Sequence, residues 1–321
     1  MLSRIYDYVI SLVTRTSQAQ RILLDLDLVD IIVSLFKDLE PVSYKVHDPK
    51  VLSEFQAHCG EKLNPYIFSE IQSGSKEHER ITDLVMKNLD IDSKYRHLVL
   101  DSVVQMCKFY SDLKKFDETC LVEISEKTHA KHFERIWKVL ENRKLPKSLH
   151  VCKSDDFNSW GCLGFQMPLT DFRKTGFLGL LSLEWMVETY PETSRKALEL
   201  SRNEQNWFPF TLTSINVTSW VLDFYNEGKL NCFSYNNDTE PLETFYTLHS
   251  YFFLNFVKFF LNSNLNNDIL NFNKISKEYK SELGNKFKKI LNENKSDKLH
   301  GNNLLKNLKE ELNVLELYIT R

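Results

Sequence analysis

The sequence contains little glycine and proline, with nine glycines and eight prolines in 321 residues. Sandwich and barrel folds need many tight turns, and these two residues are among the commonest in turns. Their scarcity argues against a turn-rich β fold and favours helices. The hydrophobic fraction of 42% and the charged fraction of 26% are ordinary for a globular protein, and the length allows one large domain or two of average size.

Strong net charge is also absent. The 41 Lys and Arg residues nearly balance the 44 Asp and Glu residues, which leaves a formal charge of −3. A charge this small points neither to nucleic acid nor to an acidic membrane as a partner. The apolar stretch at the N-terminus is interrupted by Asp7 and bounded by Arg4 and Arg15, so we expect neither a transmembrane segment nor a secretory signal.

The six cysteines form no C-x-x-C pair and are irregularly spaced. In a chain of this length without a signal peptide, that pattern predicts reduced thiols and a cytoplasmic location. Cys162 is the best candidate for a nucleophile paired with a histidine, because it lies in the glycine-rich segment described below. A small apolar filler near Gly164 is the more ordinary role for this cysteine.

Motifs for independent chemistry are missing too. The chain has no G-x-x-x-x-G-K-[ST] phosphate loop, no G-x-G-x-x-G, no G-x-S-x-G, no H-E-x-x-H and no EF-hand loop. We therefore expect no cofactor and no self-contained active site. His129, His132 and Glu134 have a spacing that could place metal ligands on one helix face. No further ligand is apparent, so a solvated helix face is favoured over a metal site.

Apolar residues recur at helical spacing along most of the chain, which predicts an all-α protein. Phe208–Tyr225 is ambiguous, because its β-branched residues suit a strand whereas its length and apolar positions suit a helix; a helix is favoured. The expected helical segments are residues 1–40, 50–72, 77–125 and 129–143, a run that ends near Tyr190, and residues 192–203, 208–225, 241–262, 275–291 and 304–318.

The segment of residues 160–185 differs in composition from the rest of the chain. It holds four of the nine glycines, in two pairs, with the polar turn Pro168–Arg173 between the pairs and the apolar run Phe177–Leu183 after them. Glycine inside a helix costs about 1 kcal/mol relative to alanine. Glycines clustered around a turn therefore indicate backbone that passes close to another group. Arg173 is the first cation of the segment and stands at the end of the turn.

The order W-x3-G-F-Q, then P-x-T-D-F-R, then G-x-L-G-L-x-x-L resembles the ELMO domain, in particular the ELMO-domain-only proteins. The resemblance implies an all-α, multi-helix bundle of the ELMO-domain type over residues 128–291. Residues 1–125 are expected to form a helical N-terminal region, and residues 292–321 a C-terminal helical tail. The residues that carry the resemblance are Trp160, Gly164, Phe165, Gln166, Pro168, Thr170, Asp171, Phe172, Arg173, Gly176, Leu178, Gly179, Leu180 and Leu183.

Proteins of this kind act as GTPase-activating proteins for Arf-family small G proteins, including the Arl2-like branch. The resemblance places the essential arginine of the family at Arg173. It implies a GTP-bound Arf/Arl-family G protein as the partner, with peripheral membrane association through that partner. Negative charge builds on the transferred phosphoryl group during GTP hydrolysis, and an arginine supplied in trans accelerates the reaction by about 10³ to 10⁵. Arginine suits this role because it stays charged and offers a planar fork of donors.

Supporting or partner-binding roles are predicted for Trp160, Gln166, Thr170, Asp171 and Lys174. Thr170 or Asp171 is expected to cap the following helix, and Asp171 could instead hold the guanidinium of the arginine. Gln166 is expected to orient the arginine or to contact the G protein. Lys174 stands where the family has glycine, which either blocks a close approach or adds a second cation near phosphate.

Other positions around the turn are expected to support it. Trp160 is predicted to anchor the turn from below together with Phe165 and Phe172. Gly176 and Gly179 are predicted to let a neighbouring helix approach. The loop is shorter than the family pattern, because only Met167 separates G-F-Q from the proline.

Two alternatives remain open at this point. Arg173 could be a structural arginine that pairs with a carboxylate and braces the fold. The whole chain could also be a non-catalytic, ELMO-like scaffold that binds a small G protein or a Dock-type exchange factor.

Overall fold

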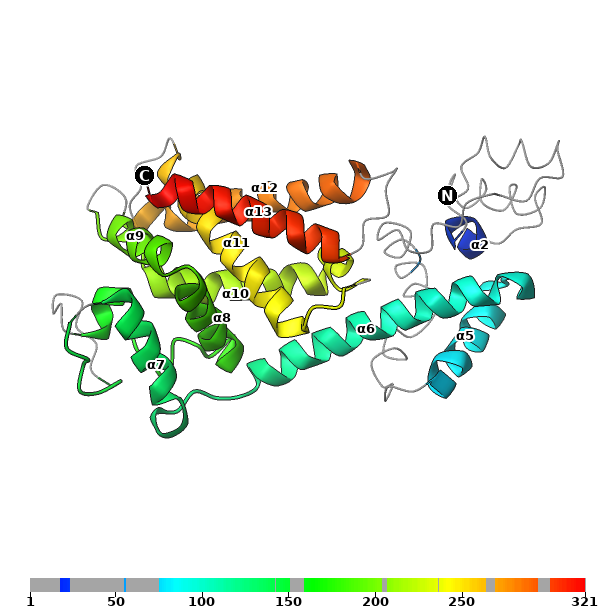
Figure 1. The fold of residues 1–321 in the computed structure, drawn as a ribbon, viewed down its shortest axis with the longest axis horizontal. Coiled ribbons are helices and arrows are strands. Elements are labelled where there is room, and N and C mark those ends of the chain that lie inside the picture. The colour runs from blue at the N-terminus through cyan, green and yellow to red at the C-terminus, as the bar shows by residue number, and fades with distance from the viewer. Residues whose placement is uncertain are drawn as a thin grey trace. The chain divides into compact units, whose positions relative to one another are not determined.

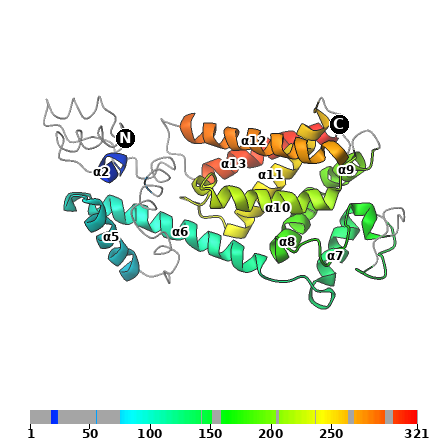
Figure 2. The ribbon, with the colours of Figure 1, turned by 180° about the vertical axis from the view of Figure 1, so that it is seen from behind.

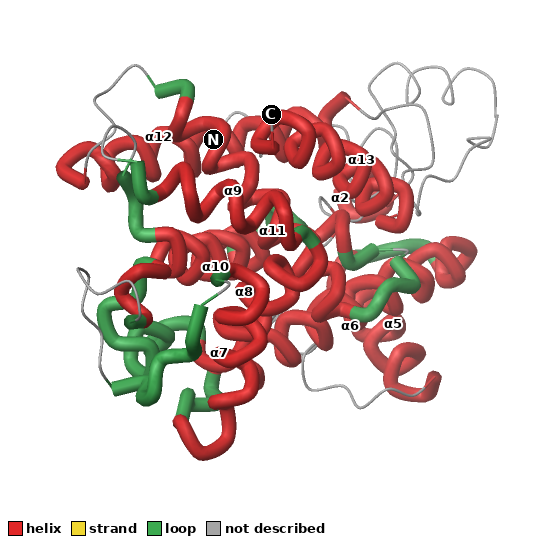
Figure 3. Tube along the Cα trace, turned by 60° about the vertical axis from the view of Figure 1, so that its left-hand side comes forward, coloured by secondary structure: helices red, strands yellow, loops and turns green. Residues whose placement is uncertain are grey.

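Figure 1 shows a computed structural model of the protein, which describes residues 18–23, 55, 75–141, 143–150, 159–203, 207–235, 237–263, 269–293 and 301–320. These residues lie in helices, turns and loops, and none of them is in a strand (Figure 3). The prediction of an all-α protein is confirmed. The helices expected over residues 1–40 and 50–72 lie outside the described residues, apart from α2 (Gln18–Leu23) and Phe55.

The chain divides into two compact units, which are described separately. The first unit comprises Met1–Lys114, Leu230–Asp238 and Ile290–Leu304, and the second comprises Lys115–Lys229, Thr239–Lys289 and Leu305–Arg321.

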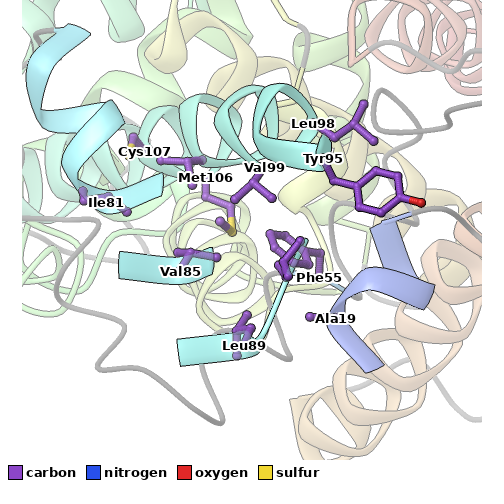
Figure 4. Close-up of a cluster of buried hydrophobic side chains, with 12 residues drawn as sticks. Ala19, Phe55, Ile81, Val85, Leu89, Tyr95, Leu98, Val99, Met106 and Cys107 are labelled. Atoms are coloured by element: carbon purple, nitrogen blue, oxygen red, sulfur yellow. The ribbon is translucent and has the colours of Figure 1, made fainter. Parts of the chain in front are cut away.

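The core of the first unit is built on α5 (Ser75–Leu89) and α6 (Arg96–Cys120). Ile81 and Val85 lie one turn apart on α5 and are fully buried in one cluster with Val99 and Met106 of α6 (Figure 4). The i, i+4 spacing puts both α5 residues on the same face of the helix. This is the apolar stripe that the sequence predicts.

The single helix expected over residues 77–125 is wrong, because the structure breaks it between α5 and α6. Asp90 has a φ of +51°, a left-handed conformation that ends α5. Asp92 then accepts a hydrogen bond of 3.0 Å from the backbone N–H of Lys94 and caps the short 3₁₀ helix η2 (Ser93–Tyr95). Aspartate tolerates the left-handed region and competes for backbone amides, so the two aspartates separate the helices without glycine or proline.

The second unit is organised around α8 (Gly176–Thr189), which packs against α7 (Glu126–Leu140), α10 (Phe210–Asn226) and α11 (Pro241–Leu261). A helix that is apolar on all sides has to be covered on all sides. The figures show α8 among these neighbours (Figures 1 and 2). The segment Phe208–Tyr225, which the sequence left ambiguous, is helical from Phe210 onward, as predicted.

The remaining helices of the second unit complete its core. α9 (Pro191–Ser201) follows α8 directly and has proline in its first turn, where the missing N–H is not needed. α12 (Ile269–Glu293) is held to α11 by a 2.7 Å hydrogen bond from the Tyr279 hydroxyl to the Phe252 carbonyl. α13 (Gly301–Thr320) accepts a 2.9 Å hydrogen bond from Tyr251 at Glu311.

Cys107, Cys120, Cys162 and Cys232, the cysteines within the described ranges, are free thiols. Among the described residues, no helix combines the length and the apolar character needed to cross a membrane.

The α10–α11 interface contains a histidine buried in its neutral form. His249 is fully buried, and its Nε2 lies 3.1 Å from the Ser214 carbonyl oxygen and 3.0 Å from the Ser214 hydroxyl. Burial lowers the pKa of His249 from 6.5 to about 4, and the hydrogen bond with Ser214 opposes this effect only in part. The unfolded chain therefore binds a proton at this residue at a pH where the folded chain does not.

We expect the stability of the protein to fall as the pH drops from 6.5 toward 4, since protons then favour the unfolded state. His249 contributes about 2 kcal/mol to the loss between pH 7 and pH 5. Urea unfolding of the wild type and of His249→Gln at both pH values measures this contribution. A pH-dependent loss of the same size in the two proteins would contradict the assignment.

Candidate functional site

The turn that carries Arg173 is closed by the carboxylate of Asp171. Asp171 accepts hydrogen bonds from the backbone N–H of Gln166 at 2.8 Å and of Met167 at 3.0 Å. Burial raises the pKa of Asp171, while the hydrogen bonds from both amides and the charge of Arg173 act in the opposite direction. The carboxylate therefore fixes the backbone that precedes Arg173.

The expectation that Thr170 or Asp171 caps the following helix is wrong. α8 begins only at Gly176, and its N-cap residue Thr175 makes no capping hydrogen bond with its side chain. Thr170 instead belongs to the turn, where its backbone N–H donates to the Met167 carbonyl at 2.8 Å. The carboxylate of Asp171 accepts from the backbone amides upstream of it instead.

An aromatic cluster supports the turn from below. Trp160, Phe165 and Phe172 are buried, and they pack with Phe133 and Trp137 of α7. The ring centroids of Trp160 and Trp137 are 5.2 Å apart, and those of Phe165 and Phe172 are 6.0 Å apart. The Trp160 indole N–H also donates to the Ser148 carbonyl at 3.2 Å. The turn is thus anchored at both ends in the core of the second unit.

The side chains of the two adjacent cations at the end of the turn behave differently. Arg173 and Lys174 are both exposed. The ammonium group of Lys174 donates to the Ser219 hydroxyl of α10 at 2.5 Å. Within the part of the chain that the structure describes, the guanidinium of Arg173 has no hydrogen bond and no ion pair. Its positive charge nevertheless acts to lower the pKa of Asp171. Gln166 is also exposed on the turn.

An ion cluster around the buried carboxylate of Glu141 holds the start of the segment. Arg202 donates to the Cys162 carbonyl at 2.8 Å and forms an ion pair with Glu141. The buried carboxylate of Glu141 is also paired with Arg143. Sequence reasoning missed these residues, because Glu141 and Arg202 are far apart in the chain and belong to no motif. The cluster fixes the 3₁₀ helix η3 (Trp160–Leu163).

Cys162 is not a nucleophile in this arrangement. Its Sγ lies 3.8 Å from a Glu141 carboxylate oxygen, and burial raises its pKa to about 11. The thiol is therefore protonated at neutral pH, whereas a reactive cysteine needs the thiolate.

The side chains of His129, His132 and Glu134 have different partners. His132 Nδ1 lies 2.7 Å from Glu184, Glu134 is paired with Lys138, and His129 Nδ1 accepts from a backbone N–H. The solvated face that the sequence favours is wrong for His129, which is buried against Phe177. No group of candidate metal ligands occurs among the described residues.

Gly176 allows two backbone segments to touch beside the turn. A Cβ atom on Gly176 would lie 1.9 Å from the Cys120 carbonyl oxygen at the end of α6, and the φ of Gly176 is +49°. Phe177 then donates its backbone N–H to the Val122 carbonyl at 3.0 Å. The glycine signal in the sequence therefore marks a real close approach.

Gly179 has a different role from the predicted one. A Cβ atom there would lie 2.3 Å from the Thr175 hydroxyl and 3.0 Å from the ring of Phe172. Gly179 leaves room for the end of the turn to fold back over the first turn of α8, so it does not serve the approach of another helix.

The family model for the ELMO/CED-12 family matches residues 113–276, which include α7, the turn and α8. The chain belongs to the ELMO/CED-12 family. The ELMO-like region thus contains the exposed Arg173 turn, the aromatic cluster below it and the buried helix after it.

Curated relatives of the chain are ELMO domain-containing proteins. ELMO domain-containing protein B of Dictyostelium discoideum is 28% identical over 293 residues, which cover 88% of this chain and 94% of that protein. ELMO domain-containing protein 3 of Homo sapiens is 36% identical over 117 residues, which cover 35% of this chain and 29% of that protein. ELMO domain-containing protein 2 of Mus musculus is 26% identical over 138 residues, which cover 41% of this chain and 45% of that protein. The matches to proteins 2 and 3 span less than half of those chains. No solved structure matches the chain.

We expect Gly176→Ala to destabilise the ELMO domain by at least about 2 kcal/mol, because alanine adds left-handed strain to the clash with the Cys120 carbonyl. Gly284→Ala in α12 is the matched control, since the nearest atom to its Cβ position is 3.6 Å away. This control is expected to raise stability by up to about 1 kcal/mol. Thermal unfolding of both variants tests the difference, and equal effects would contradict the close approach.

Proposed function

We propose that this protein is a GTPase-activating protein for a small G protein of the Arf/Arl family and that it supplies Arg173 in trans. One observation carries the proposal: the guanidinium is exposed on a fixed turn and is unpaired within the described ranges. A structural arginine that braces the fold would be paired with a carboxylate there. Membership of the ELMO/CED-12 family supports the same conclusion.

In this mechanism the partner holds the nucleotide and the ELMO domain contributes one cation. The N–H groups of Arg173 would donate to phosphoryl oxygens as negative charge builds on them during hydrolysis. An interaction that strengthens in the transition state lowers the barrier, whereas uniform binding does not. The hydrogen bonds of Asp171 and the aromatic cluster hold the backbone in place before the partner arrives, so little ordering of the loop is needed.

The two departures from the family pattern are compatible with this role. Lys174 directs its ammonium group to Ser219 of α10, so the side chain that replaces glycine lies against its own unit. Asp171 closes the turn over Gln166 and Met167, which accommodates the short loop. The chain would act in the cytoplasm and reach a membrane only through a membrane-associated G protein.

We expect Arg173→Ala to reduce the stimulated rate of GTP hydrolysis by about 10³-fold, because the transition-state charge loses its counterion. Arg173→Lys restores little of the rate, since lysine lacks the planar fork of donors. The measurement is single-turnover hydrolysis by a panel of GTP-loaded Arf/Arl-family proteins, with circular dichroism to check the fold.

Lys306→Ala on α13 is the control for loss of an exposed cation, because Lys306 has no ion pair within the described ranges. Full activity of Arg173→Ala would overturn the proposal. A stable complex with a G protein or a Dock-type exchange factor, without faster hydrolysis by the wild type, would favour the scaffold alternative.

Apolar residues beside the turn are expected to contact the same partner. Leu121 is 80% exposed and Val122 is 44% exposed. The Val122 carbonyl accepts a hydrogen bond from the backbone N–H of Phe177, which lies four residues after Arg173. Leu121→Asp should raise KM about tenfold with kcat unchanged, as a loss of roughly 1.4 kcal/mol of binding implies. Leu317→Asp, on the exposed face of α13, is the matched control. An equal change in KM for the two variants would exclude Leu121 from the interface.

A further inference from the structure

A pocket of about 390 Å³ lies between α10 and α12 of the second unit. Asn216 and Trp220 line it from α10, and Ser276, Lys277 and Lys280 line it from α12. Figure 2 shows these two helices alongside each other. The second unit contains all of these residues.

Two of the polar side chains that line the pocket are lysines, which only donate hydrogen bonds, whereas Asn216, Asn273 and Ser276 can both donate and accept. Lys277 is exposed and has no ion pair among the described residues, while Lys280 is 2.6 Å from Asp223. Ser276 is only 9% exposed, and its buried hydroxyl has no hydrogen-bond partner within the described ranges. A buried hydroxyl without a partner is unfavourable by about 1 to 3 kcal/mol. An anionic acceptor in the pocket would pair with the ammonium group of Lys277, and rotation of the Ser276 side chain about χ1 would bring its hydroxyl to the same acceptor.

The lining of the pocket suits a carboxylate on an aliphatic stem. The rings of Trp220 and Phe272 provide apolar walls beside the donors. An aspartate or glutamate side chain combines an acceptor head with methylene groups that can lie against such rings. The ammonium groups of Lys277 and Lys280 outnumber the single carboxylate of Asp223, so the local charge suits an anion.

The pocket lies close to the turn that carries Arg173. Ser219, which accepts the hydrogen bond from Lys174, lies between Asn216 and Trp220 on α10. Asn216 therefore lies about 4.5 Å along the helix axis from Ser219, and Trp220 about 1.5 Å. A protein interface covers about 800 Å² on each partner, a patch roughly 30 Å across. A protein that receives Arg173 would cover the pocket as well.

We propose that this pocket binds an acidic side chain of the same small G protein and thereby determines which G protein the ELMO domain accepts. The inference rests on the proposed function, because it uses the position of the pocket beside Arg173. The carboxylate docks between Lys277 and Ser276 and takes no part in GTP hydrolysis.

The test is a charge reversal in the pocket with two matched controls. Lys277→Glu should raise KM at least tenfold for the preferred GTP-loaded Arf/Arl-family protein while kcat changes by less than twofold. Lys274→Glu on the same helix and Lys306→Glu on α13 make the same charge change at exposed positions that do not line the pocket. Both controls should leave KM within about twofold. If Lys277→Glu does not fold, Lys277→Met removes the charge without reversing it.

Direct binding separates this inference from the proposed function. The affinity of each variant for G proteins loaded with a non-hydrolysable GTP analogue is measured in the Arg173→Ala background. A weaker affinity confined to the Lys277 variants supports the pocket, even if the wild type accelerates no hydrolysis. Equal affinities of the Lys277 and Lys306 variants overturn it and leave the role of Arg173 intact. Absence of any binding by the wild type overturns both proposals.

A membrane lipid is the competing source of an anion. Wild type and Lys277→Glu are compared for binding to phosphatidylcholine vesicles with and without phosphatidylserine. Loss of vesicle binding together with an unchanged KM for the G protein in solution would overturn the inference.

Discussion

The pair of hydrogen bonds from backbone amides to the Asp171 carboxylate is the constraint on which the site depends. Those amides belong to Gln166 and Met167, so one carboxylate holds a loop that has no regular secondary structure. The aromatic cluster of Trp160, Phe165 and Phe172 provides the surface on which the loop rests. Without the carboxylate, the loop would have to order itself when a partner binds, at about 1 to 2 kcal/mol for each backbone position that becomes fixed.

The buried helix α8, which follows the turn, gives the turn a rigid support. α8 is packed on several sides, so its first turn has little freedom to move. The contact of Gly176 with the carbonyl of Cys120 ties that first turn to the end of α6. Protein interiors are packed like crystals and do not deform gradually. The backbone at Arg173, which comes just before this helix, is therefore held in one conformation.

Local sequence patterns predict most of the helices and part of the site. The 3.6-residue period identifies the helices, and the clustered glycines indicate the close approach at Gly176. The break between α5 and α6 was missed, because Asp90 and Asp92 end a helix through backbone conformation and capping, and neither changes the apolar period. The ion pair of Glu141 with Arg202 and the pocket between α10 and α12 arise only when distant helices pack, so a single sequence carries no signal for them.

The exposed position of Arg173 has a consequence for the energetics of association. Many arginines at protein surfaces are held by a nearby acid, and that bond has to break before the side chain can move into a partner. The guanidinium of Arg173 has no such bond within the described residues. Its transfer into a neighbouring molecule breaks no hydrogen bond or ion pair of the described residues, and what it loses is hydration, the attraction to Asp171 and about 2 kcal/mol of side-chain rotamer entropy. The reorganisation of the free protein before the encounter is correspondingly small.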